Sequence, residues 1–230
     1  MNRNTLKYIA ALAMLVDHIS MVFLPIASLP GAGMRVIGRL TAPIMCFFLA
    51  EGFRYTSSRK KYGIRLLLAA LISQVPYALL HYGTLFVTDF NVLFTLFFSF
   101  LMLIVWEDMK VDPRRYPLVF GLIFISNWCD WGIVGPLFVL FFAIFRDDRN
   151  AQARAYSLIA AAMIVTDSVF LAVNHNHWYG ELWQLGLYLF LPLLYCYNGE
   201  GGSRKPFHKW FFYVFYPLHL AVLYAVKLCI

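Results

Sequence analysis

The chain has 230 residues, of which 61% are hydrophobic, 18% aromatic and only 13% charged. This composition excludes a soluble globular domain of ordinary makeup, because a soluble fold needs a more polar surface. The net charge of +7 does not indicate a nucleic-acid partner, because the basic residues are spread over separate loops. The sequence therefore predicts an all-α polytopic protein whose partner is the lipid bilayer.

Apolar stretches follow one another along the whole chain. Most run close to the roughly 17 to 25 residues that a spanning helix needs, but 117–127 and 132–145 are short. We expect about nine spanning helices, within a range of about eight to ten, in one domain covering residues 1–230. The predicted segments are 6–24, 36–53, 64–81, 91–106, 117–127, 132–145, 155–174, 183–197 and 210–228.

Basic residues predict which loops lie in the cytoplasm. Lys and Arg concentrate in cytoplasmic loops, and an inside N-terminus puts all of the 19 basic residues there except Arg35, Arg39 and Lys227. The alternation therefore predicts a cytoplasmic N-terminus. The inner basic residues are Arg3, Lys7, Arg54, Arg59, Lys60, Lys61, Arg65, Lys110, Arg114, Arg115, Arg146, Arg149, Arg154, Arg204, Lys205 and Lys209.

Asp17 and His18 stand side by side in the middle of the first apolar segment. An Asp at the centre of a spanning helix costs about 2.5 to 3.5 kcal/mol, so such residues usually face a polar interior and take part in function. His219 lies about 15 Å above the inner face and Gln74 about 13 to 14 Å, close to about 16 Å for His18. We expect a polar pocket at mid-membrane depth, walled by the first, third and ninth segments.

Two charged residues lie at opposite ends of the second segment. Arg39 and Glu51 are about 18 Å apart along a helix, so they cannot pair with each other. We expect Arg39 to contact Asp17 or Asp130, and Glu51 to meet basic side chains at the cytoplasmic rim.

Uncharged polar residues extend the predicted pocket. Asn91 and Thr95 are four residues apart and share a helix face. With Gln74, they either form hydrogen bonds between helices or contact a ligand. The four cysteines lie far apart without metal-ligand spacing, so we expect neither a metal nor a disulfide framework.

Ordered strings of residues along nearly the whole chain carry a family resemblance. The strings are Leu6-Lys-Tyr-Ile-Ala, Asp17-His-Ile, Gly38-Arg-Leu-Thr-Ala-Pro-Ile, Phe48-Leu-Ala-Glu-Gly-Phe, Arg65-Leu-Leu, Ser73-Gln-Val-Pro-Tyr, Asn91-Val-Leu-Phe-Thr, Asp130-Trp-Gly-Ile-Val-Gly and Phe212-Tyr-Val-Phe-Tyr-Pro-Leu-His-Leu. In both order and spacing, they resemble the TraX family of membrane proteins.

The resemblance implies acyl transfer. The member that gives the family its name is associated with N-terminal acetylation of a pilin, and the family is similar to membrane acyltransferases that use acyl-coenzyme A. Those enzymes carry an Arg/Lys-x10-His motif in the first helix, which Lys7 and His18 match. As a hypothesis, we assign catalysis to His18, Asp17, His219 and Tyr216. The residues assigned to substrate binding are Arg39, Gln74, Asn91, Thr95, Asp130 and Glu51. The phosphates of acetyl-coenzyme A or another acyl-coenzyme A would contact Lys7, Arg54, Arg59, Lys60, Lys61 and Arg65.

The hypothesis is thus an acyltransferase-like helical bundle in a bacterial cytoplasmic membrane. His18 would be the general base, and the acceptor would be an amine or hydroxyl of an extracytoplasmic pilin-like protein, peptide or glycan. The alternative is a proton-coupled carrier, for which an Asp and a His at mid-depth are equally natural. A dependence on coenzyme A would distinguish the two.

Overall fold

The structure is a computed structural model that describes residues 1–26, 28–174, 177–203 and 205–229. The described residues form α-helices and two 3-10 helices, with one isolated bridge between Phe90 and Cys129. The prediction of an all-α protein is therefore confirmed. Arg204, one of the predicted inner basic residues, lies outside the described residues.

Two compact units make up the chain, Met1–Met45 with Phe145–His208 and Cys46–Ile144 with Lys209–Ile230. Two helices, α3 (Thr41–Tyr55) and α10 (Pro206–Cys229), run from one unit into the other. The first unit also holds α1 (Arg3–Phe23), α2 (Leu29–Gly38), α8 (Arg149–Val173), η2 (Leu182–Leu189) and α9 (Phe190–Cys196). The second holds α4 (Arg59–Tyr82), α5 (Val92–Asp108), α6 (Arg115–Ile125), η1 (Ser126–Trp128) and α7 (Val134–Ile144).

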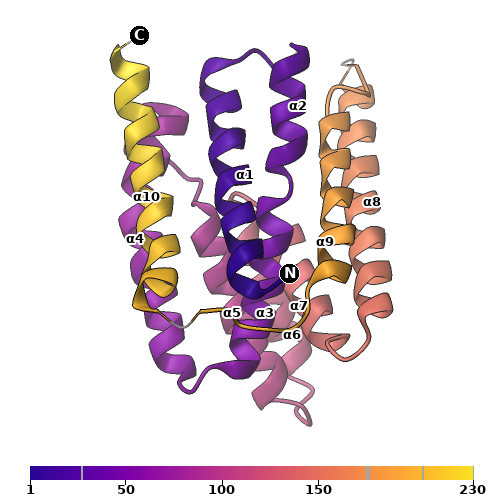
Figure 1. Ribbon diagram of the computed structural model, residues 1–230. Helices are drawn as coiled ribbons and strands as arrows, with labels where there is room; N and C mark the ends of the chain where they lie inside the picture. Colours follow the sequence, from indigo (N-terminus) through magenta and orange to yellow (C-terminus); the bar gives the residue numbers. More distant parts are fainter. Residues whose placement is uncertain (27, 175–176, 204, 230) are drawn as a thin grey trace. The chain divides into compact units, whose positions relative to one another are not determined.

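In the first unit, α2 packs against both α1 and η2, and η2 also packs against α8 (Figure 1). The helix starts have polar caps, since the Asn2 side chain accepts a hydrogen bond from the Thr5 N–H at 3.0 Å at the start of α1. At the start of α2, the Ser28 hydroxyl accepts from the Gly31 N–H at 3.1 Å, and Pro30 lies in the first turn. These caps stabilise the starts of α1 and α2.

In the second unit, α5 packs against α4, α6 and α7. Gly83 ends α4 in the left-handed region with φ 69°, and its N–H donates to the Leu79 carbonyl at 3.0 Å. The Lys227 ammonium of α10 donates to the Leu80 carbonyl of α4 at 3.1 Å, so it satisfies a carbonyl in the last turn of that helix.

Among the described residues, five helical stretches are long and apolar enough to cross a membrane, and each overlaps a predicted segment. The other four predicted segments form shorter elements, including α6 and α7 with 11 residues each. The count of nine spans therefore stays a prediction. The five stretches are Arg3–Phe23, Leu29–Tyr55, Arg59–Tyr82, Arg149–Val173 and Trp210–Cys229.

Segments 36–53 and 183–197 are not continuous α-helices. Segment 36–53 is interrupted, because α2 ends at Gly38 and α3 begins at Thr41. Pro43 gives the physical reason, since it has no N–H to donate to the Arg39 carbonyl and its ring crowds that carbonyl. Segment 183–197 starts as the 3-10 helix η2 and becomes the α-helix α9 only at Phe190.

Candidate functional site

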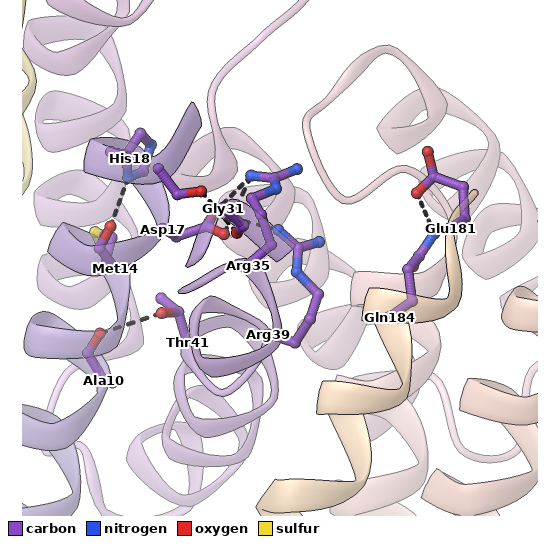
Figure 2. Close-up of polar contacts among 11 residues, drawn as sticks. Ala10, Met14, Asp17, His18, Gly31, Arg35, Arg39, Thr41, Glu181 and Gln184 are labelled. Atoms are coloured by element: carbon purple, nitrogen blue, oxygen red, sulfur yellow. Dashed lines mark hydrogen bonds and ion pairs between the residues drawn. The ribbon is translucent and has the colours of Figure 1, made fainter. Parts of the chain in front are cut away.

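Asp17 of α1 forms ion pairs with Arg35 of α2 and with Arg39, the C-cap residue of that helix. Arg35 Nη1 lies 3.1 Å from both carboxylate oxygens of Asp17, and Arg39 Nη2 lies 3.2 Å from Oδ2 (Figure 2). The side chains of Asp17, Arg35 and Arg39 are 14%, 16% and 12% exposed, respectively. The predicted contact between Asp17 and Arg39 is therefore confirmed, and Arg35 joins it.

Arg35 was missed as a site residue because the sequence prediction began its second helix at residue 36. The helix α2 begins at Leu29, so Arg35 lies one turn before Arg39 on the same face. The spacing of four residues between the two arginines was the signal in the sequence. Figure 2 shows both side chains leaving α2 in the direction of Glu181 and Gln184.

Small residues allow the helices of this unit to approach closely. A β-carbon at Gly38 would overlap the Asp17 side chain, and one at Gly186 would overlap the Val36 carbonyl. The Ser20 hydroxyl of α1 donates to the Gly31 carbonyl of α2 at 2.9 Å. The ion pairs therefore form beside two close helix contacts, at Gly38 and Gly186, where the glycines have no side chain to keep the neighbouring helix away.

Trp183 of η2 completes the contact between α2 and η2. The guanidinium carbons of Arg35 and Arg39 lie 4.3 and 4.5 Å from the centre of its ring. This distance is typical of a cation–π interaction. The indole Nε1 of Trp183 is buried and has no hydrogen-bond partner among the described residues.

Two further carboxylates lie in the same unit, bridged by one amide. Gln184 Nε2 donates to Asp167 Oδ2 at 2.7 Å and to Glu181 Oε2 at 3.2 Å. Burial, and then the charge of Asp167, raise the pKa of Glu181, whereas the amide of Gln184 and the two arginines act in the opposite direction. We define the ionic cluster as Asp17, Arg35, Arg39, Asp167, Glu181, Trp183 and Gln184.

His18 follows Asp17 but makes a different contact. Its Nδ1 lies 2.8 Å from the Met14 carbonyl oxygen. A carbonyl oxygen only accepts hydrogen bonds, so Nδ1 carries the proton and a neutral ring has its lone pair on Nε2. Lys7, the other residue of the predicted motif, lies on the same helix about 16 Å along the axis.

His219 makes the same type of contact in the second unit. Its Nδ1 donates to the Phe215 carbonyl at 2.8 Å, and its ring lies 5.6 Å from the ring of Tyr216. His81, which the sequence prediction missed, interacts electrostatically with His219, and its ring lies 4.3 Å from the ring of Tyr77. The Leu80-His81 dipeptide at the end of an apolar run was the only signal for it in the sequence.

Asp130 lies close to this group of aromatic residues. It is exposed, and it interacts electrostatically with Tyr77 and Tyr216. Its backbone N–H donates to the Phe90 carbonyl at 2.8 Å. The second unit therefore brings together three predicted site residues, Asp130, Tyr216 and His219. His18 belongs to the first unit, so the predicted pocket shared with His219 and Gln74 stays a prediction.

Gln74 and Asn91 bind each other and the backbone. Asn91 Nδ2 donates to Gln74 Oε1 at 2.8 Å and to the Ala70 carbonyl at 2.9 Å, while Gln74 Nε2 donates to the Asp89 carbonyl at 2.8 Å. Asn91 also caps α5, since its Oδ1 accepts from the Leu93 N–H at 3.0 Å. These contacts support the alternative that both residues hold α4 and α5 together.

Thr95 is buried in contacts of its own. Its hydroxyl accepts from the Trp131 N–H at 3.5 Å, and its carbonyl accepts from the Ser99 hydroxyl at 2.7 Å. A β-carbon at Gly135 would press on the methyl group of Thr95, so α5 and α7 pack closely there. The contacts of Thr95 likewise support an interhelical role.

The residues of the predicted coenzyme A site other than Lys7 of α1 are basic residues on α3 and α4. Arg59 pairs with Asp108 at 2.6 Å and lies 4.4 Å from the Phe53 ring. The buried Nε of Arg65 has no hydrogen-bond partner among the described residues. Arg54, Lys60 and Lys61 are exposed, and Glu51 is half-buried near the end of α3.

The described part of the chain contains no group of three or more His, Cys, Asp or Glu side chains placed to hold a metal ion. The four cysteines are free thiols, of which Cys46 and Cys129 are buried and Cys196 and Cys229 are exposed.

Long apolar helices and an ion-pair cluster held between them define a helical membrane protein with a polar site inside its first unit. The chain belongs to the TraX family, whose model, described as TraX protein, matches residues 2–227. It is 35% identical to the probable fimbrial assembly protein FimC, serogroup H1, of Dichelobacter nodosus, over 97% of this chain and 94% of that protein. No solved structure matches the chain.

Proposed function

We propose that this protein is a membrane acyltransferase. It would transfer an acetyl or other acyl group from cytoplasmic acyl-coenzyme A to an amine or hydroxyl of an extracytoplasmic acceptor. The name of the relative, a probable fimbrial assembly protein, favours a pilin-like acceptor; a peptide or glycan has the same reactive groups. Membership of the TraX family supports the reaction class, because the family is linked to pilin acetylation.

The observation that carries the proposal is the hydrogen bond between His18 Nδ1 and the Met14 carbonyl at 2.8 Å. It orients the ring and selects the neutral tautomer whose Nε2 accepts a proton. In the reaction, Nε2 takes the proton of the acceptor N–H or O–H, and the acceptor atom bonds to the acyl carbon. The C–S bond breaks, and the leaving thiolate takes up the proton from the imidazolium.

Other residues would bind and stabilise the reactants. Lys7, Arg54, Lys60, Lys61 and Arg65 offer positive charge for the phosphates of coenzyme A, and Arg59 adds to it. His219 or Tyr216 would stabilise the thioester oxygen as charge develops on it. The proposal includes an acyltransferase-like bundle of nine spanning helices with a cytoplasmic N-terminus. It places the protein in a bacterial cytoplasmic membrane.

The test is release of free thiol from acetyl-coenzyme A by the purified protein in nanodiscs. His18→Asn is a suitable variant, because the Asn amide can keep a donor near the Met14 carbonyl while lacking a basic nitrogen. We expect thiol release by the wild type and a loss of about 100-fold or more in the variant. Equal rates in both proteins would contradict the role of His18.

Substrate binding separates this function from the carrier. Acetyl-coenzyme A and longer acyl donors are added to the wild-type protein, and both binding and thiol release are measured. No binding and no release with any donor would contradict the transferase. Coupled uptake of a solute without use of coenzyme A would then favour the carrier.

A further inference from the structure

The ionic cluster contains hydrogen-bond donors that its own carboxylates do not use. Arg35 reaches Asp17 through Nη1 alone, so its Nε and Nη2 make no hydrogen bond to a described residue. Trp183 Nε1 is buried and also has no partner among the described residues. A buried N–H without an acceptor costs about 1 to 3 kcal/mol, so the buried Trp183 Nε1 favours a ligand. The unused nitrogens of Arg35, whose side chain is 16% exposed, offer that ligand further donors.

The chemistry of the donors selects the ligand class. Guanidinium groups bind carboxylates and phosphates in a planar, two-pronged geometry, and stacking on an aromatic ring holds them in place. Arg35 and Arg39 lie 4.3 and 4.5 Å from the Trp183 ring centre. Both side chains keep some exposure, at 16% and 12%, so the cluster is not sealed from outside.

We propose that Arg35, Arg39 and Trp183 form a binding site for a carboxylate or phosphate group of the acyl acceptor. This inference rests on the proposed function and specifies the acceptor as an anionic molecule. Asp17 holds the two arginines in position, and His18 follows it on α1. A bound anion would therefore hold the acceptor close to the helix turn that carries the general base, which shortens the search for a reactive geometry.

Glu181 is the internal competitor of the bound anion. It interacts electrostatically with both arginines of α2, and it faces Asp167 of α8 and the amide of Gln184 in η2. Asp17 of α1 is the remaining charge of the cluster and stays paired with the arginines. An ionised Glu181 opposes anion binding and a protonated one does not, so the affinity falls as the pH rises.

The experiment is a titration with sulfate, whose charge is constant between weakly acidic and weakly alkaline pH. The protein is held in phosphatidylcholine nanodiscs at constant ionic strength, and the tryptophan fluorescence is recorded. Subtracting the titration of Trp183→Phe isolates the signal of Trp183. We expect a saturable fluorescence change in the wild type, with a higher affinity for sulfate at lower pH. In Glu181→Gln we expect the affinity for sulfate not to depend on pH.

Matched variants test the arginines. Arg35→Gln and Arg39→Gln should each weaken sulfate binding by about tenfold or more, and Arg35→Lys by less, because lysine keeps the charge but loses the planar group. Arg154→Gln, at an exposed position of α8, should bind like the wild type. Thermal unfolding identifies any variant that fails to fold, and Arg35→Lys then remains the test.

The outcomes are distinct. No saturable signal in the wild type, or equal binding by Arg35→Gln, overturns the site. A signal that appears only when phosphatidylglycerol replaces part of the phosphatidylcholine assigns the cluster to a lipid headgroup and overturns the acceptor. Sulfate binding without any thiol release from acetyl-coenzyme A refutes the transferase but retains an anion site. Thiol release without sulfate binding refutes only the proposed anion site.

Discussion

Gly38 of α2 faces the Asp17 side chain so closely that a β-carbon at position 38 would overlap the carboxylate. The same carboxylate accepts hydrogen bonds from Arg35 on this helix and from Arg39, which caps its C-terminal end. The absence of a side chain at position 38 therefore sets the distance between α1 and α2 at which the ion pairs form.

Gly38→Ala should destabilise the protein, whereas Gly33→Ala on the same helix should not. The added methyl at position 38 would displace Asp17, but at position 33 it would meet no atom within 4 Å. Alanine also favours a helix over glycine by up to about 1 kcal/mol, so Gly33→Ala should be neutral or stabilising. Thermal unfolding in nanodiscs checks both variants. Equal changes in unfolding temperature would show that the contact at Gly38 is not tight.

Asp17→Asn should cost on the order of 3 kcal/mol of stability, because two partly buried arginines would lose their shared counter-charge. Asp147→Asn serves as the control, since that side chain is 76% exposed in its pair with Arg146. Exposed substitutions of this kind usually change stability by less than about 0.5 kcal/mol. If the two variants unfold at the same temperature, the ion pairs do not stabilise the first unit.

Asn91→Ala distinguishes a structural role from ligand binding. Asn91 is 0% exposed, and its side-chain amide makes three hydrogen bonds. Loss of this amide should lower the free energy of unfolding by about 2 to 3 kcal/mol. Thiol release per folded protein should stay unchanged. Asn198→Ala, in an exposed loop, is the matched control. A variant with normal stability but lost thiol release would instead support the predicted contact with substrate.

Glu181→Gln should remove part of the pH dependence of stability. Burial raises the pKa of Glu181, so the folded protein binds this proton more tightly than the unfolded chain does. The resulting stability is fully present below the ordinary glutamate pKa of about 4.3 and is lost as the pH rises through the folded pKa. Thermal unfolding midpoints between weakly acidic and neutral pH should fall less steeply for the variant. Parallel curves for the two proteins would contradict the raised pKa.

The sequence predicted that Arg39 contacts either Asp17 or Asp130, because a charge inside a spanning helix needs a partner. The structure selects Asp17. Arg35 was missed because the start of α2 was placed too late. Trp183 and Glu181 were also missed. They stand where a polar loop meets an apolar segment, and nothing in this local pattern indicates that they meet residues near position 35. The break at Pro43 was visible in the sequence but was read as part of one long segment.

The sequence by itself determined the class of protein, the family and the unusual pair Asp17-His18. Hydropathy, the cost of burying charge and ordered motifs are properties of local segments, so they can be read without a fold. Only the tertiary structure decided which charges meet. Residues of α1, α2 and η2 come together through close approaches at Gly38 and Gly186, where the missing side chains let the backbones pack. Such packing depends on the shapes of segments far apart in the chain, and no local pattern encodes it.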